Sequence, residues 1–414
     1  MKYFFILGQN PTLSSAEITA VLEQLKLKFS FLGLSNDVLL LETEKSLNIQ
    51  ELMPRLGGTA KAGFVANEFL EIAAEDILKF FKNIAEKKIY FGFSFYKLDE
   101  AIAAREFKKE RDKMRPLAMD VKKRLKETGY LVRWVTSKEN NLSSVVVKKN
   151  KLLAQEGAEF VFFLTSTGKI LLGKTLAVQE FEELSFRDYG RPIRSMKVGL
   201  MPPKLAKAMI NLAKVGQTAV ILDPFCGFGT ILEEATLWGY ENLIGSDISR
   251  DVLEGTKQNL EWLAKTYNLQ LTTYNLFQSD VRKISKKLPV YSVDAIVTEP
   301  YLGPPLQGNE PVEKINQIIK ELSSLYLDAF REFKKILKPK GRVAILFPIF
   351  HTLSADLFLP ILEEIKKIGF EITDLLPNKL IKHPVIKITP RNSIIYSRPD
   401  QRVWREVFIF RLKI

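Results

Sequence analysis

The feature that most constrains the fold lies in the second half of the chain, where an apolar run ends in an acidic residue, turns through two glycines and opens a helix. It reads Ala-Val-Ile-Leu-Asp-Pro-Phe-Cys-Gly-Phe-Gly-Thr-Ile-Leu over residues 219–232. Glycine permits tight turns and close ligand approach, and a helix start offers unpaired N–H groups to an anionic ligand end. A strand that enters a helix in this way is typical of an α/β protein. Any such protein also uses Gly and Asp in plain turns and caps, so this stretch alone is weak support for a ligand site.

The rest of the second half repeats this alternation and predicts an open, mostly parallel sheet of the Rossmann-like type. We expect seven strands, of which the last two form an antiparallel closing hairpin. The expected strands are 219–222, 243–246, 272–276, 293–297, 343–347, 380–388 and 403–412. The expected helices are 203–213, 231–238, 251–267, 313–337 and 353–368.

The first half has a different pattern, in which helices stand among short strands as in an α+β region. We expect helices at 14–25, 75–85 and 114–128, and strands at 89–95, 130–135, 143–148, 160–164 and 170–174. The Tyr-Gly-Arg-Pro turn signal at 189–192 indicates a linker. The chain of 414 residues exceeds the usual size of a single domain, so we expect more than one core.

Composition excludes several classes of protein. The chain has one cysteine, Cys226, so an intrachain disulfide is impossible, and its two histidines leave little for a His-based metal site. The apolar run at residues 3–7 stops at Gly8, short of a signal segment, and no apolar stretch approaches the roughly 18 residues that span a bilayer. These observations predict a cytoplasmic protein without membrane segments or bound metal.

Positive charge is concentrated in one part of the chain. The formal net charge is +13, distributed as −2 over residues 1–100, +8 over 101–150, +1 over 151–200 and +6 over 201–414. Such concentration indicates a nucleic-acid partner, although a single basic run is also typical of a solvated helix face. The candidate RNA-binding residues are Lys122, Lys123, Arg124 and Lys126, with Arg398, Arg402 and Arg405 expected on the turn between the last two strands.

Three acidic residues follow three successive expected strands: Asp223, Asp247 and Asp280. Ligands of doubly wound folds bind at the carboxyl ends of the strands, and an acid about 20 residues after the glycine turn can bind both hydroxyls of a ribose. Asp280 would then meet an adenine amino group. A dinucleotide fold normally has a third glycine, but position 232 is Leu. The alternative is that these acids are caps and turn residues.

Asp-Pro-Phe-Cys-Gly-Phe-Gly-Thr resembles the first motif of class I methyltransferases that use S-adenosyl-L-methionine, in the subgroup acting on exocyclic amino groups. This resemblance implies that Asp223 and the Gly227/Gly229 loop hold the amino acid moiety of the cofactor, Asp247 its ribose and Asp280 its adenine. The candidate cofactor-binding residues are Asp223, Pro224, Cys226, Gly227, Gly229, Thr230, Asp247, Ile248, Asp280 and Val281.

The fourth expected strand ends in Thr298-Glu299-Pro300-Tyr301, where amino methyltransferases carry Asn/Asp-Pro-Pro-Tyr/Phe. An exocyclic amine conjugated to its ring is a poor nucleophile until hydrogen-bond acceptors draw on its protons, and an aromatic ring can stack on the flipped base. In register with Tyr301, Thr298 takes the Asn/Asp place, but Glu299 could serve as the acceptor one residue later. Both remain candidates, with Pro300 and Tyr301, as catalytic residues.

Further segments resemble the THUMP-domain tRNA guanine-N2 methyltransferases of archaea and eukaryotes, which modify guanosine 10. They are Phe-Ile-Leu-Gly-Gln-Asn-Pro-Thr from residue 5, Arg133-Trp134, and residues 142–147, 172–179, 186–192, 199–206 and 396–406. The resemblance implies an N-terminal ferredoxin-like piece (1–65), a THUMP RNA-binding domain (66–182), a linker (183–200) and a class I methyltransferase domain (201–414). It also implies tRNA as the substrate.

We therefore expect a monomeric tRNA (guanine-N2-)-methyltransferase that flips its target base onto Tyr301. The alternatives are an amino methyltransferase acting on ribosomal RNA or DNA, and an RNA-binding protein with a decayed methyltransferase domain. The residues leave open which tRNAs are substrates, whether one or two methyl groups are added, and whether a small activating protein is needed.

Overall fold

A computed structural model describes residues 1–82, 84–194, 201–269, 273–308, 310–352, 355–398 and 401–413. The chain divides into two compact units. The first contains Met1–Ser15, Lys26–Phe181 and His383–Val385, and the second contains Ala16–Leu25, Glu182–Lys382 and Ile386–Ile414. Each unit has its own sheet.

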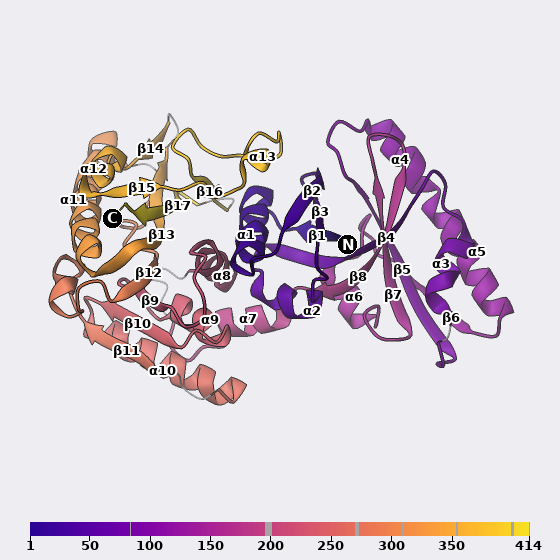
Figure 1. Ribbon diagram of the computed structural model, residues 1–414, viewed down its shortest axis with the longest axis horizontal. Coiled ribbons are helices and arrows are strands. Elements are labelled where there is room, and N and C mark those ends of the chain that lie inside the picture. The colour runs from indigo at the N-terminus through magenta and orange to yellow at the C-terminus, as the bar shows by residue number, and fades with distance from the viewer. Residues whose placement is uncertain are drawn as a thin grey trace. The chain divides into compact units, whose positions relative to one another are not determined.

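Within its described residues, the first unit contains an eight-stranded mixed sheet (Figure 1). The strand order is β2 (Phe29–Leu34), β3 (Val38–Thr43), β1 (Lys2–Leu7), β4 (Thr59–Phe69), β8 (Ile170–Val178), β7 (Gly157–Leu164), β5 (Lys88–Lys97) and β6 (Leu131–Val135). Strand β5 pairs in parallel with β6 and β7, and the other neighbours are antiparallel. The strands expected at 89–95, 130–135, 160–164 and 170–174 are confirmed, whereas β1 to β4 had not been expected.

Most helices of this unit bury apolar side chains, and α4 (Ala104–Asp112) is the exception. The helices are α2 (Ile49–Leu52), η1 (Met53–Arg55), α3 (Ala74–Leu78), η2 (Lys79–Phe81), α4, α5 (Met114–Glu127) and α6 (Ser144–Lys149), and α1 (Pro11–Gln24) is divided between the units. Met114, Ala118, Val121 and Leu125 of α5 recur every three or four residues and pack with Phe160 and Phe162 of β7 in one core.

The strand expected at 143–148 is wrong, because these residues form α6. The hydroxyl oxygen of Ser143 accepts a hydrogen bond from the N–H of Val146 at 3.3 Å, which caps the helix. Three successive valines favour a strand by propensity, but the Ser143 cap and the burial of Val147 stabilise a helix.

The second unit contains, in its described residues, a nine-stranded sheet. Its main path runs β11 (Thr273–Gln278), β10 (Asn242–Asp247), β9 (Val220–Asp223), β12 (Val293–Thr298), β13 (Leu337–His351), β17 (Val403–Leu412) and β15 (Phe370–Ile372). The first five are parallel, and β17 is antiparallel to both its neighbours. Short strands β14 (Asp356–Phe358) and β16 (Ile394–Tyr396) pair with β13 and β17. The Rossmann-like sheet with antiparallel strands is confirmed.

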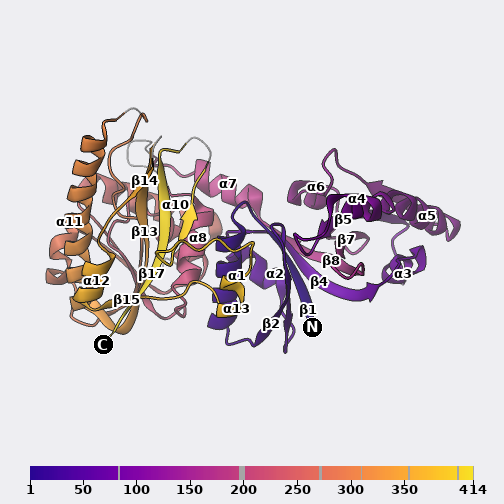
Figure 2. The ribbon, with the colours of Figure 1, turned by 90° about the horizontal axis from the view of Figure 1, so that it is seen from above.

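Helices lie on both faces of this sheet. Figure 2 shows α11 (Val312–Ile336) and α12 (Leu362–Ile368) on one face, and α8 (Pro203–Leu212) and α10 (Arg250–Tyr267) on the other. Helix α9 (Thr230–Leu237) packs beside α8, and the 3₁₀ helix η3 (Val281–Lys286) beside α11. The remaining helices are α7 (Phe181–Tyr189) and α13 (Asn378–Ile381). The helices expected at 203–213, 231–238, 251–267 and 313–337 are confirmed within one residue at each end.

The strand expected at 380–388 is wrong, and β16 pairs with β17 in its place. Pro384 interrupts the apolar run and has no N–H to donate to a sheet. The helix expected at 353–368 is confirmed only from Leu362, because Pro360 precedes it and β14 occupies 356–358. Residues 353 and 354 lie outside the described residues, as does residue 272 of the third expected strand.

The predicted domain boundaries remain predictions. Strand β4 runs across the boundary between residues 65 and 66, and α7 occupies the first part of the predicted linker. The end of that linker, residues 195–200, lies outside the described residues. In the part of the chain that the structure describes, no helix is long and apolar enough to cross a membrane, and no cluster of three metal-ligating side chains is found.

Candidate active site

One cavity of about 1050 Å³ lies in the second unit where the carboxyl ends of β9, β10 and β12 meet the start of β17. Most of the predicted site residues line it, which brings together positions up to 182 residues apart in the chain. They are Asp223, Pro224, Cys226, Gly227, Thr230, Asp247, Ile248, Asp280, Val281, Glu299, Pro300, Tyr301, Arg402 and Arg405. Gly229, Thr298 and Arg398 were also predicted but are not among its lining residues.

The glycine turn between β9 and α9 has the backbone conformation that requires glycine. Gly227 and Gly229 have φ values of 51° and 90°, in the left-handed region that other residues rarely adopt. A Cβ at Gly227 would meet no heavy atom within 4 Å, so the turn faces open space there. A Cβ at Gly229 would lie 2.8 Å from Cγ2 of Thr256. The first glycine therefore leaves room for a ligand, and the second permits packing against α10.

Asp247 at the end of β10 links the glycine turn to the next helix. One carboxylate oxygen accepts a hydrogen bond from the N–H of Gly227 at 3.2 Å, and the other accepts one from the N–H of Ser249 at 2.9 Å. Ser249 in turn caps α10 by accepting a hydrogen bond from the N–H of Val252. The carboxylate is thus held at the cavity wall by two backbone groups, and its remaining lone pairs can accept bonds from two hydroxyls.

Asp223 at the end of β9 is only 2% exposed. Its Oδ1 accepts hydrogen bonds from the Thr298 hydroxyl at 2.7 Å and from the N–H of Phe225 at 3.2 Å. Burial raises the pKa of this carboxyl to about 7, although the two hydrogen bonds oppose the shift. Its charge near neutral pH therefore depends on what occupies the cavity.

Asp280 lies at the cavity rim, after β11. It accepts a hydrogen bond from the N–H of Arg282 at 3.0 Å, and the Arg282 guanidinium binds both its oxygens at 2.6 to 3.0 Å. These hydrogen bonds from Arg282 hold the pKa of Asp280 below its usual value. Asp280 is therefore an ionised acceptor whose orientation is set by its neighbour.

Thr298 and Glu299 point to different partners. Thr298 is completely buried and donates its hydroxyl to Asp223. Glu299 lines the cavity, and its carboxylate binds the Arg405 guanidinium through Nε–Oε1 at 2.5 Å and Nη2–Oε2 at 3.4 Å. Burial by itself lowers the pKa of Arg405, but the Glu299 carboxylate reverses this and holds it above its usual value. Of the two candidates, Glu299 is the one with a carboxylate at the cavity.

Tyr301 presents a free aromatic ring beside this carboxylate. Its side chain is 56% exposed, which is unusual for so large a ring and leaves it open to stacking. Its carbonyl accepts a hydrogen bond from the hydroxyl of the buried Tyr326 on α11 at 3.2 Å. The backbone after Pro300 is thereby held while the ring stays accessible.

The predicted basic residues lie in two places. Lys122, Lys123, Arg124 and Lys126 are on α5 in the first unit, away from its buried face, and Arg124 pairs with Asp120 and Glu75. Arg402 lines the cavity, whereas Arg405 is within β17 and only 9% exposed. The guanidinium of Arg398 lies near the Tyr396 hydroxyl.

Several cavity residues had not been expected from the sequence. They include Phe225, Phe228, Ser249, Ser279, Arg282 and Gln401. The serine cap before α10 is a signal that could have identified Ser249, because Ser directly before a helix commonly caps it. Arg282 and Gln401 carry no such local signal.

Comparisons with known proteins agree with the fold. The family described as RMKL-like, methyltransferase domain matches residues 191–356. A tRNA (guanine(10)-N2)-dimethyltransferase of Methanocaldococcus jannaschii is 36% identical over 161 residues, which cover 37% of this chain and 44% of the relative. A probable tRNA (guanine(10)-N2)-dimethyltransferase of Methanothermococcus thermolithotrophicus is 38% identical over 115 residues, which cover 27% of this chain and 68% of the relative.

Among solved structures, TrmN from Thermus thermophilus matches the whole of both chains with a TM-score of 0.52 and 15% identity. This similarity concerns the fold alone. The chain matches less than half the length of the first two curated relatives.

Proposed function

The chain belongs to the family of tRNA (guanine(10)-N2)-dimethyltransferases, and from this premise we propose that it transfers methyl groups from S-adenosyl-L-methionine to the N2 amino group of a guanosine in tRNA, at position 10. The observation that carries the proposal is the single cavity that collects three strand-end carboxylates, the open glycine turn and the Glu299-Pro300-Tyr301 segment. The three carboxylates and the glycine turn suit an adenosyl cofactor. The Glu299-Pro300-Tyr301 segment suits a flipped base.

The cofactor half of the cavity fits an adenosyl ligand. The open space at Gly227 accommodates a ligand that a side chain would exclude. Asp247 would accept hydrogen bonds from the ribose hydroxyls, Asp280 one from the adenine amino group, and Asp223 would pair with the amino acid ammonium. Ile248, which is 64% exposed, offers an apolar surface to the adenine ring. When bound, the cofactor supplies an electrophilic methyl group.

The substrate half activates the amine by accepting its protons. The guanine N2 lone pair is conjugated with the ring, so acceptors that draw on its N–H groups make it more nucleophilic. Glu299 has a carboxylate at the cavity, and the Pro300 carbonyl follows it in the chain, whereas the Thr298 hydroxyl is committed to Asp223. The exposed ring of Tyr301 would stack on the flipped base. Burial raises the pKa of the Cys226 thiol well above its usual value, which argues against a covalent step.

Recognition of tRNA is assigned to the basic side chains. Lysines 122, 123 and 126 on α5 would contact phosphates and 2′-hydroxyls, as RNA helices are recognised mostly through backbone and shape. Arg402 at the cavity would contact RNA next to the target base. A cytoplasmic location, a monomeric state and a small activating protein remain predictions.

The proposal is tested with purified protein, tritiated S-adenosyl-L-methionine and unmodified tRNA. We expect label on the N2 atom of guanosine 10, identified by nuclease digestion and mass spectrometry. Label on ribosomal RNA or DNA alone would contradict the proposed substrate. Cofactor binding without transfer to any RNA would favour a decayed enzyme.

Arg405 is expected to position Glu299. In Arg405→Met the methyl-transfer rate at pH 7 should fall about 10-fold, because the Glu299 carboxylate loses the guanidinium that orients it. The affinities for cofactor and tRNA should stay within about two-fold. The matched variant Arg402→Met, also at the cavity, should instead weaken tRNA binding and leave the rate at saturating tRNA within about two-fold of the wild type. The same response from both variants would contradict the positioning role.

Cofactor affinity is expected to depend on pH through Asp223. Its pKa of about 7 means that the carboxyl is mostly protonated below pH 7 and must ionise to pair with an ammonium group. The affinity for S-adenosylhomocysteine, measured by calorimetry, should therefore rise by up to about 10-fold per pH unit from pH 5.5 and level off near pH 7.5. Asp223→Asn should abolish this slope. Glu233→Gln should keep it, although burial also raises the pKa of Glu233 to about 7, because Glu233 does not line the cavity.

A further inference from the structure

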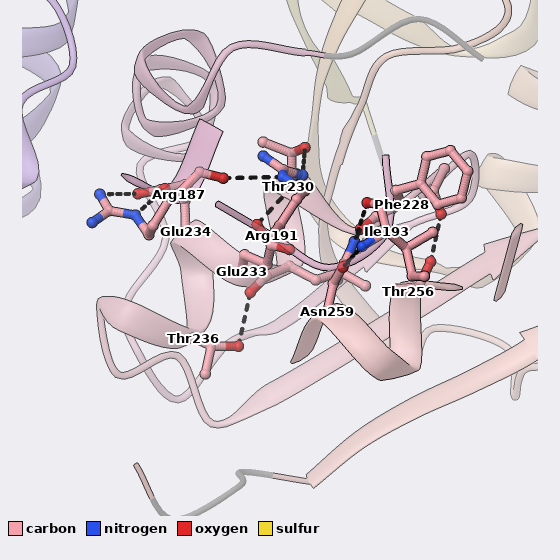
Figure 3. A network of polar contacts seen from close by, with 12 residues as sticks. Arg187, Arg191, Ile193, Phe228, Thr230, Glu233, Glu234, Thr236, Thr256 and Asn259 are labelled. Atoms are coloured by element: carbon pink, nitrogen blue, oxygen red, sulfur yellow. Dashed lines mark hydrogen bonds and ion pairs between the residues drawn. The ribbon is translucent and has the colours of Figure 1, made fainter. Parts of the chain in front are cut away.

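A polar network lies behind the glycine turn and connects it to residues 187–193, which comprise the last three residues of α7 and the four that follow (Figure 3). These residues, called segment 187–193 below, fall in the predicted linker and outside the predicted methyltransferase domain. All the contacts described here are made within the second unit. The side chains involved come from segment 187–193, α9 and α10.

The first contact is an ion pair between Arg187 and Glu234. Arg187 donates from Nε to Oε1 at 2.7 Å and from Nη2 to Oε2 at 3.2 Å. Both side chains are almost completely buried, and such bidentate pairs have a well-defined geometry. Separating the two side chains would leave buried charges without a partner, which is energetically costly. The pair therefore holds the start of segment 187–193 against α9.

The second contact reaches the cavity itself. Arg191 donates from Nε to the carbonyl of Arg187 at 3.0 Å and from Nη1 to the hydroxyl of Thr230 at 2.7 Å. Thr230 is the first residue of α9 and lines the cavity. The Arg191 side chain is fully buried and also lies 3.5 Å from Glu233. Arg191 therefore connects segment 187–193 to the residue that follows the glycine turn.

The third contact joins segment 187–193 and the turn through one side chain. Asn259 on α10 is completely buried. Its Oδ1 accepts a hydrogen bond from the N–H of Ile193 at 2.9 Å, and its Nδ2 donates to the carbonyls of Ile193 and Phe228, both at 3.0 Å. Phe228 is the residue between the two glycines of the turn. Asn259 thus uses both ends of its amide to hold the two backbones together.

Neighbouring residues of α10 tighten the same junction. Thr256, one turn before Asn259, donates its hydroxyl to the carbonyl of Gly227. A Cβ at Gly255 would lie 2.9 Å from side-chain atoms of both Ile193 and Phe228. The carbonyls of Gly227 and Phe228 are therefore held from behind the turn, while the N–H of Gly227 is held by Asp247.

We infer that segment 187–193 contributes to cofactor binding. Arg191 of this segment and Asn259 of α10 are positioning residues that hold the glycine turn in its cofactor-binding conformation. A turn with two left-handed residues has many alternative conformations once released, and a preorganised turn binds its ligand more tightly. The inference rests on the proposed function for the identity of the ligand, an adenosyl cofactor. The residues needed for cofactor binding would then begin before residue 201, where the methyltransferase domain was predicted to start. The family match also begins earlier, at residue 191.

The test compares full-length variants in their affinity for S-adenosylhomocysteine, measured by calorimetry, and in their kcat at saturating cofactor. Asn259→Ala and Arg191→Met should each raise the Kd about 10-fold or more, with kcat within about three-fold of the wild type, because neither side chain lines the cavity. Arg191→Lys, which can still donate to Thr230, should recover part of the affinity. Gln258→Ala, an exposed neighbour of Asn259 on α10, serves as the matched control and should bind like the wild type.

The thermal midpoint of each variant separates positioning from folding. If Asn259→Ala and Arg191→Met melt at lower temperature but bind with the wild-type Kd, the residues are merely structural and the inference is overturned. If Asn259→Ala does not fold, the isosteric Asn259→Asp, which loses both donated hydrogen bonds, decides the question by its Kd. A wild-type protein that binds the cofactor but methylates no tRNA would contradict the proposed function and leave this result standing.

Discussion

Replacement of Glu299 by Gln is expected to lower the methyl-transfer rate by about 100-fold, which is the low end of the usual contribution of a positioned proton acceptor. The carboxylate lines the cavity and is oriented by Arg405, whereas the amide that replaces it presents a donor on one side and a weaker acceptor on the other. Cofactor affinity should stay within about two-fold of the wild type, because Glu299 lies at the end of β12 and not in the glycine turn. Single-turnover transfer from labelled cofactor measures this effect directly.

One control makes the same chemical change elsewhere, and a second variant tests Thr298 as the rival acceptor. Glu313→Gln, on the exposed start of α11, should transfer at the wild-type rate. Thr298→Val removes the hydroxyl that donates to Asp223 and should weaken cofactor binding more than it slows transfer. A greater loss of transfer rate in Thr298→Val than in Glu299→Gln would make Thr298 the acceptor and refute our assignment.

Replacement of Asp247 by Ala is expected to raise the Kd for S-adenosylhomocysteine by about 100-fold or more. The carboxylate accepts hydrogen bonds from the N–H groups of Gly227 and Ser249, and we propose that it also binds the ribose. Hydrogen bonds to a charged group contribute about 1.5–3 kcal/mol each, and every 1.4 kcal/mol is about a tenfold change in affinity. The loss of two or more such bonds therefore accounts for the expected effect.

The matched variant is Asp251→Asn, four residues further on and exposed in the first turn of α10. It should bind S-adenosylhomocysteine like the wild type. A Kd for Asp247→Ala within about three-fold of the wild type would show that the ligand does not contact the end of β10, and the placement of the cofactor would have to be abandoned.

The architecture of the second unit could largely be predicted from the sequence, because its strands are short apolar runs with acidic or glycine-rich ends. The errors have local physical causes. Pro384 interrupts the apolar run that was expected to form a strand. Ser143 caps a valine-rich stretch that was expected to form a strand and forms a helix instead. The order of the eight strands in the first unit depends on pairing between distant segments, for which a single sequence carries little signal.

The cofactor half of the site was easier to predict than the substrate half. Asp223, Asp247 and the two glycines stand at fixed positions relative to predictable strands. The choice between Thr298 and Glu299 depends on Asp223 and Arg405, which lie 75 and 106 residues away. The contacts of Asn259 with Ile193 and Phe228 likewise join segments 66 and 31 residues apart. Such long-range contacts exist only in the folded chain, and local patterns do not encode them.

The position of β17 between β13 and β15 has a consequence for how the second unit is made on the ribosome. This strand lies between β13 and β15 but is synthesised after both, so the growing chain must leave a gap in the sheet until residues 403–412 emerge. Until then the edge of β13, with the apolar side chains of Ile345 and Phe347, has no partner strand and is open to pairing with other chains. Arg405 also arrives with that strand. The nascent unit should therefore be most prone to aggregation just before it acquires the residue that orients Glu299.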